Sequence, residues 1–300
     1  MKKKTYLFAL MAMALTLGSC SDNENGIGGE TSKYITVSTS IGNMTRVATD
    51  AKGGQTFEEG DEISVYAWTG DATVAPETRE RVVNNAINKL TNGSWISNPQ
   101  MLWKNNRDKH YFIGVYPISA ISDLSAGEYT FDETKQVESD LLVAVNKDGL
   151  SYNVDEQQPV PLTFTHVMAK LVVNLTYKNQ WGGIPTVEKV VVGNAAKEAT
   201  INYLTKVVTP STTAKEDFSL PEITENTKYV SVIIPQEEVK QLTIVIGGKN
   251  FVYDNGTPFK LESGKITTVN LEVGRDEIKL GDVKITNWED GSTFSGEALN

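Results

Sequence analysis

The side chains most often used in thiol, acid–base and zinc chemistry are scarce in this chain. Its 300 residues contain 1 Cys and 2 His, namely Cys20, His110 and His166. A single Cys permits no internal disulfide, and this set cannot form a zinc site of the usual nitrogen and sulfur type unless carboxylates supply most of the ligands. We therefore predict no metal site and no cofactor.

The two histidines have surroundings that favour a structural role. His166 lies in an apolar stretch from Phe164 to Leu171, and His110 follows Asp108 and Lys109. A general base needs a cleft and an orienting carboxylate, and no such carboxylate stands beside His166 in the sequence. We expect His166 to form a hydrogen bond at a domain junction. The chain also lacks a Gly-x-Ser-x-Gly elbow, a phosphate-binding glycine loop and EF-hand spacing, so we predict that it is not an enzyme.

The single Cys follows a segment typical of protein export. Lys2, Lys3 and Lys4 precede an uncharged stretch that runs to Leu17, which is too short to span a bilayer as a mature anchor. The tetrad Leu17-Gly18-Ser19-Cys20 resembles the bacterial lipobox. This resemblance implies that residues 1–19 are a lipoprotein signal peptide and that Cys20 is acylated. An incidental thiol in an exported protein is the alternative.

We expect residues 20–32 to form an acidic, flexible tether. The stretch from Ser21 to Gly26 is similar to export signals of surface-displayed lipoproteins of Gram-negative bacteria, and a plain solvated tether is the alternative reading. Together with the lipobox, it predicts a lipid-anchored, surface-exposed protein of the outer membrane. The formal net charge of -10 opposes binding to a phosphate backbone, so nucleic acid is not an expected partner.

From Lys33 onward the pattern is that of an all-β protein. Val, Ile, Thr and Tyr alternate with polar residues, and Gly, Asn, Asp or Pro interrupt the runs. Residues 79–90 have apolar side chains at helical spacing, but the following Thr91-Asn92-Gly93-Ser94 is typical of a hairpin turn, so we predict strands there. Residues 162–177 read as one long strand. Prolines at 159 and 161 mark a seam, which predicts two β-sandwiches of about seven strands each, over 33–158 and 159–300.

The five tryptophans allow a second reading of the function. Exposed aromatic rings on a β-sandwich can stack on sugar faces, which would suit a surface glycan-binding lipoprotein. Trp68 and Trp288 stand at strand ends, where a buried ring is the commoner role. We expect core or rim positions for most of the five rings, which are Trp68, Trp95, Trp103, Trp181 and Trp288.

An ordered set of motifs resembles the fimbrillin family of type V pili. In the first half these are Thr45-Arg46-Val47, the run from Phe57 to Tyr66, Trp95, Trp103 and Phe112 to Pro117; in the second half they are Phe164 to Leu171, Leu261 to Thr268 and Ile285 to Trp288. The resemblance covers nearly the whole mature chain. It implies two tandem transthyretin-like β-sandwiches and a structural or anchoring pilus subunit that supports cell adhesion and assembles with other subunits.

The resemblance also implies how assembly begins. Residues 33–46 would form a removable first strand, with Ile35, Val37 and Ile41 on the face that fills the core. An Arg-specific protease would cut after Arg46 and leave Val47 as the new N-terminus. A strand from a neighbouring subunit would then fill the open groove by donor-strand exchange. The ligand to which such a pilus adheres is not predicted.

Overall fold

The computed structural model describes residues 34–42, 56–152 and 158–288, and it confirms the predicted all-β class. These residues form the strands β1 to β19 and two short 3-10 helices, η1 (Thr78–Glu80) and η2 (Asn179–Trp181). In the described part of the chain, no helix is long and apolar enough to cross a membrane.

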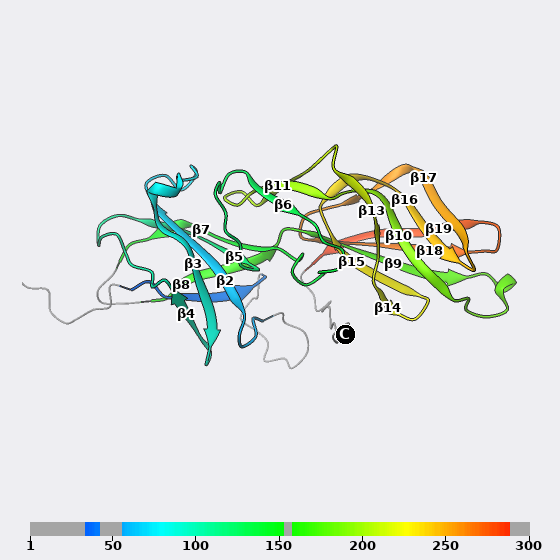
Figure 1. The fold of residues 1–300 in the computed structure, drawn as a ribbon, viewed down its shortest axis with the longest axis horizontal. Coiled ribbons are helices and arrows are strands. Elements are labelled where there is room, and N and C mark those ends of the chain that lie inside the picture. Colours follow the sequence, from blue (N-terminus) through cyan, green and yellow to red (C-terminus); the bar gives the residue numbers. More distant parts are fainter. Residues whose placement is uncertain (1–33, 43–55, 153–157, 289–300) are drawn as a thin grey trace, which may run out of the picture. The chain divides into compact units, whose positions relative to one another are not determined.

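The first half is organised around one seven-stranded sheet (Figure 1). In spatial order its strands are β1 (Val37–Ile41), β8 (Val160–His166), β7 (Leu142–Leu150), β5 (His110–Tyr116), β2 (Glu62–Thr69), β3 (Arg81–Thr91) and β4 (Ser94–Asn98). β1 runs parallel to β8, and every other neighbouring pair in this sheet is antiparallel. The sheet curls around its own core, so that its two edge strands approach each other. The Trp95 indole of β4 donates a hydrogen bond of 3.0 Å to the Thr39 hydroxyl of β1, at the opposite edge.

The second half contains three further sheets. The five-stranded sheet has the order β14 (Glu222–Thr224), β15 (Lys228–Ile233), β9 (Ala169–Tyr177), β18 (Lys265–Val273) and β19 (Ile278–Asn287). The four-stranded sheet has β13 (Lys215–Ser219), β10 (Val187–Ala196), β16 (Gln236–Ile246) and β17 (Lys249–Leu261). The three-stranded sheet has β12 (Val207–Pro210), β11 (Glu198–Asn202) and β6 (Gly127–Thr130).

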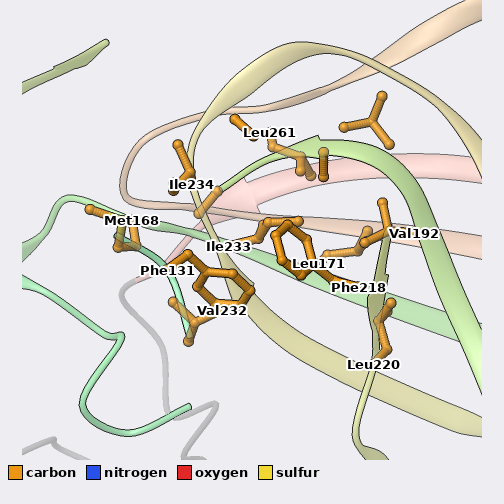
Figure 2. Packing of buried hydrophobic residues seen from close by; sticks show 14 of the residues in the cluster. Phe131, Met168, Leu171, Val192, Phe218, Leu220, Val232, Ile233, Ile234 and Leu261 are labelled. Atoms are coloured by element: carbon orange, nitrogen blue, oxygen red, sulfur yellow. The ribbon is translucent and has the colours of Figure 1, made fainter. Parts of the chain in front are cut away.

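The second half holds one large apolar core, which includes residues of β9, β10, β15 and β16 and also takes in Tyr66, Ile113 and Val143 of the seven-stranded sheet. Figure 2 shows part of it, where Phe131 lies among side chains of the second half. The Phe131 and Phe218 rings meet edge to face with centroids 4.8 Å apart. Since Phe131 directly follows β6, this core also binds a segment that the sequence assigned to the first domain.

The sheets therefore exchange strands across the expected boundary between residues 158 and 159. β8 begins just after it but pairs with β1 and β7 of the first sheet, and β6 precedes it but pairs with β11. The predicted long strand over residues 162–177 is wrong: it consists of β8 and β9, which belong to different sheets. The buried residues Val167 and Met168 carry the chain between the two sheets, so the apolar pattern continues although the strand does not.

The predicted hairpin is confirmed from Arg81 onward by the antiparallel pairing of β3 with β4, while Arg79 and Glu80 lie in the 3-10 helix η1. Asn92 and Gly93 have φ of 51° and 73°, as a two-residue hairpin turn requires. The helix-like spacing has a local cause. The register between β2 and β3 shifts between Val83 and Ala86, and Asn85 has φ of 56°. This bulge inserts one residue, so the buried positions are three apart instead of two.

Candidate functional site

The first strand is built into the core of the seven-stranded sheet by its side chains. Ile35 and Val37 are 2% and 6% exposed, and Ile41 is partly buried against the same cluster. These three residues point inward because side chains alternate along a strand, while Ser38 and Ser40 face solvent. The structure therefore brings together the three residues predicted to plug the core.

β8 lies beside β1 in the same sheet and is its ladder partner. Its sequence alternates in the same way, and Val160, Leu162 and Phe164 are 0%, 1% and 0% exposed. Phe164 fits tightly, since a Cβ added at Gly114 would lie 2.7 Å from its ring. Without β1, this row of apolar side chains would lose its cover along the edge of the sheet.

The backbone of β1 is bonded continuously on one side only. Toward β8 the pairing runs from Val37 with Val160 to Ile41 with Phe164, and the Gly42 N–H donates to the Phe164 carbonyl at 2.8 Å. On the other side, the Ile35 N–H donates to the Met101 carbonyl at 2.9 Å. The rest of that side borders a groove of about 740 Å³, whose walls include Phe57, Leu90, Trp95, Ile96 and residues 36–41. β1 is therefore an edge strand with a filled core below it and a groove beside it.

The other predicted processing residues lie outside the described part of the chain. These are Cys20, Arg46 and Val47. The described residues stop at Gly42, directly after β1, and start again at Thr56. Ile41 and Thr56 both border the groove. Arg46 thus belongs to the connection that follows β1 in the chain.

The two histidines make structural contacts. In His110, Nε2 accepts the Lys104 N–H at 3.1 Å, so Nδ1 carries the proton and donates to the Asp108 carbonyl at 3.0 Å. Burial lowers the pKa of His110, which favours this neutral form. His166 contacts Asp140, with Nδ1 and Oδ1 2.7 Å apart. Sequence inspection missed this carboxylate, because it stands 26 positions away and only the fold brings it near.

The imidazole of His166 also lies flat against the indole of Trp288. The ring centroids are 4.0 Å apart and the planes differ by 5°. His166 is 9% exposed and Trp288 is 6% exposed. The contact joins the end of β8 to the residue that follows β19. In the described residues, no group of three or more His, Cys, Asp or Glu side chains could hold a metal ion.

All five tryptophans lie in the described residues, and none of them is fully exposed. Trp68 and Trp288 are buried, and Trp95, Trp103 and Trp181 are partly buried. The Trp95 indole donates its hydrogen bond to Thr39, and its ring meets the Phe57 ring edge to face with centroids 5.3 Å apart. Trp68 and Trp103 border a second hollow of about 780 Å³, where Trp68 donates its indole N–H to the Asp71 carbonyl. These rings act mainly in packing.

Known proteins share both the sequence pattern and the fold. A family model described as fimbrillin-like matches residues 45–288. A protein of Bacteroides uniformis with the provisional name fimbrium subunit Fim1C is 24% identical over 316 residues, covering 97% of each chain.

Two solved structures illustrate the shared fold. One, from Bacteroides ovatus and described provisionally as a cell adhesion protein, has a TM-score of 0.64 and 18% identity over 85% of this chain and 98% of its own. The other, the C-terminally truncated tip fimbrial protein Mfa3 of Porphyromonas gingivalis, has a TM-score of 0.50 and 10% identity over 77% and 95%.

Proposed function

Because the chain belongs to the fimbrillin-like family, we propose that it is a subunit of a bacterial fimbria whose first strand is a removable plug. The subunit is exported as a lipoprotein, anchored to the outer membrane through Cys20 and displayed at the cell surface. An Arg-specific protease cuts after Arg46, and a strand from another subunit takes the place of β1. The resulting filament supports cell adhesion. The names of the fimbrial relatives agree with this proposal.

The position of β1 at the edge of the sheet is the observation that carries the proposal. A central strand could not leave without breaking ladders on both sides, whereas β1 has one continuous ladder, with β8. Its departure would expose the apolar surface that Ile35 and Val37 now cover. Two side chains of this size contribute about 3–6 kcal/mol by burial, so the place vacated by β1 has a strong tendency to capture a replacement strand.

A second subunit offers a suitable replacement. A strand added to the exposed edge of β8 would restore the main-chain hydrogen bonds, and its alternate side chains would refill the core positions. The donor strand and the groove belong to different parts of a subunit. Such a contact is heterologous, so repetition builds a filament instead of a closed dimer.

The plug is tested by cutting the purified precursor with an Arg-specific protease. We expect N-terminal sequencing to give a fragment that begins at Val47, and electron microscopy to show filaments or capture of a donor peptide. The Arg46→Ala variant should stay intact and monomeric under the same conditions. The proposal is wrong if the cut protein stays monomeric with partner subunits supplied, or if Arg46→Ala polymerises as well as the parent.

The anchor is tested separately by metabolic labelling with a fatty acid. Cys20→Ser changes one atom and should abolish the label, while the precursor keeps its signal segment. Label in the variant equal to that in the parent would exclude Cys20 as the acylated residue.

A further inference from the structure

β8 depends on β1 for most of its length. β7 pairs with β8 only from Phe164 to His166, whereas β1 pairs with it from Val160 to Phe164. The Val160 N–H donates to the Thr36 carbonyl at 2.8 Å, ahead of the first residue of β1. When β1 leaves, the first half of β8 therefore loses its pairing strand and keeps partners only at its C-terminal end.

That same C-terminal end holds the last described residue of the chain. His166 stacks on the Trp288 indole, and the Lys170 ammonium of β9 lies 5.2 Å from the centroid of the same ring. The backbone N–H of Trp288 donates to the Gly264 carbonyl at 3.1 Å. Gly264 is also close to β8, since a Cβ there would lie 3.0 Å from the His166 carbonyl.

The side chains of β19 are mostly exposed. β19 is an edge strand that pairs with β18, and every residue from Gly281 to Asn287 is exposed. Val283 and Ile285 are each 38% exposed, whereas Trp288 is 6% exposed. The C-terminal part of β19 is therefore retained by its ladder, by exposed side-chain hydrogen bonds from Asn270 to Asp282 and from Lys265 to Asn287, and by the buried contacts of one indole ring.

We infer that β8 couples the presence of β1 to the retention of β19. Loss of β1 loosens the first half of β8 as far as Phe164, the one residue of β8 that pairs with both β1 and β7. The change at Phe164 weakens the stack of His166, two residues further on, against Trp288, and β19 then separates from β18 more often. This inference rests on the proposed function, in which β1 is removed. It adds that removal of β1, the first described strand, changes the stability of β19, the last described strand. β19 is the two-state element, and β1 biases it through β8.

Hydrogen exchange of the full chain, measured by mass spectrometry at a concentration where the protein is monomeric, tests the coupling. Exchange in the segment that holds the Val160 amide reports whether β1 has left, and exchange across β19 reports whether that strand opens. After cleavage at Arg46 we expect both to become faster, β19 by at least tenfold. Faster exchange at Val160 with unchanged protection of β19 overturns the coupling.

Two variants separate His166 from general destabilisation. His166→Ala should open β19 in the uncut protein, and cleavage should then add little. His110→Ala removes a histidine that is also buried but lies in β5, and its β19 should still respond to cleavage as the parent does. If His110→Ala matches His166→Ala in both respects, the relay through His166 is wrong.

A further variant separates the coupling from the proteolytic step. In the double substitution Ile35→Asp and Val37→Asp, two carboxylates at core positions should expel β1 from the uncut chain. Val160 and β19 should both exchange faster. A fully protected β19 in this variant overturns the coupling whatever the protease does. Continued protection of Val160 in the cleaved parent would instead contradict the proposed removal of β1.

Discussion

β1 and β19 are both edge strands, but different forces hold them. β1 has five residues, runs parallel to β8, and places its inward side chains in a closed core. β19 has ten residues, runs antiparallel to β18, and is exposed along most of its length. β1 is thus retained mainly by side-chain burial and β19 mainly by its backbone ladder and Trp288.

This difference determines what each strand leaves behind. Removal of β1 uncovers apolar side chains of β8 that are otherwise fully buried, so the gap has to be refilled. Separation of β19 uncovers less apolar surface and can occur as a local opening within a folded subunit. A covalent cut suits the first strand, and a reversible equilibrium suits the last.

The largest expected effect comes from shortening a plug side chain. Ile35→Ala should lower the free energy of unfolding by about 2–5 kcal/mol, because it leaves a cavity in the core. The matched change in β19, Ile285→Ala, should cost about 0.5 kcal/mol or less, since Ile285 is partly exposed already. Urea unfolding of the uncut protein measures both. Equal losses would show that the two strands are retained in the same way.

A smaller effect is expected from pH at the Lys170 ammonium of β9, which lies against the ring of Trp288, the residue after β19. Burial lowers the pKa of Lys170 to about 8, against 10.5 for an ordinary lysine. The folded state therefore releases this proton more readily than the unfolded state, and the cost of burying the charge, full below pH 8, disappears as pH rises toward 10.5. Relative to Lys170→Met, the parent should gain stability on the order of 1 kcal/mol over that window.

The control for this pH effect is β1. Residues 35–42 contain no titratable side chain, so the loss caused by Ile35→Ala should stay constant over the same pH range. Unfolding is measured for the parent, Lys170→Met and Ile35→Ala in parallel at pH values of about 7.5, 8.5 and 9.5. These measurements give the stability difference between the parent and each variant across the window. A parent that loses stability relative to Lys170→Met as pH rises would contradict the assigned direction of the pKa shift.

The same two regions show what the sequence could predict. The alternation of Ile35, Val37 and Ile41 was enough to place their side chains in the core, because a strand has a strict period of two. The break between β8 and β9 gave no signal, since the connecting residues Val167 and Met168 are as buried as the strands.

Contacts between distant segments were also beyond prediction. Asp140 and Trp288 meet His166 from a loop and from the end of β19, and their sequence separation carries no information about this meeting. Local pattern therefore predicted which faces are buried. The assignment of strands to sheets depends on long-range packing, as the pairing of β6 with β11 shows.

The last expected effect concerns a single side-chain hydrogen bond, the one that links β1 to β4. Trp95→Phe keeps an aromatic ring beside Phe57 but removes the donor to Thr39, and Thr39→Val removes the acceptor. Each change should cost about 0.5–1.5 kcal/mol, and the double variant should lose less than the sum, because both remove the same bond.

Trp181→Phe is the matched control, since Trp181 donates to the Val273 carbonyl at the end of β18 at 3.0 Å. It should cost a similar amount and add fully to Thr39→Val. In hydrogen exchange, Trp95→Phe should speed exchange at Val160, which reports on β1, and Trp181→Phe should not. Strict additivity of Trp95→Phe with Thr39→Val would show that this bond does not help to retain the first strand.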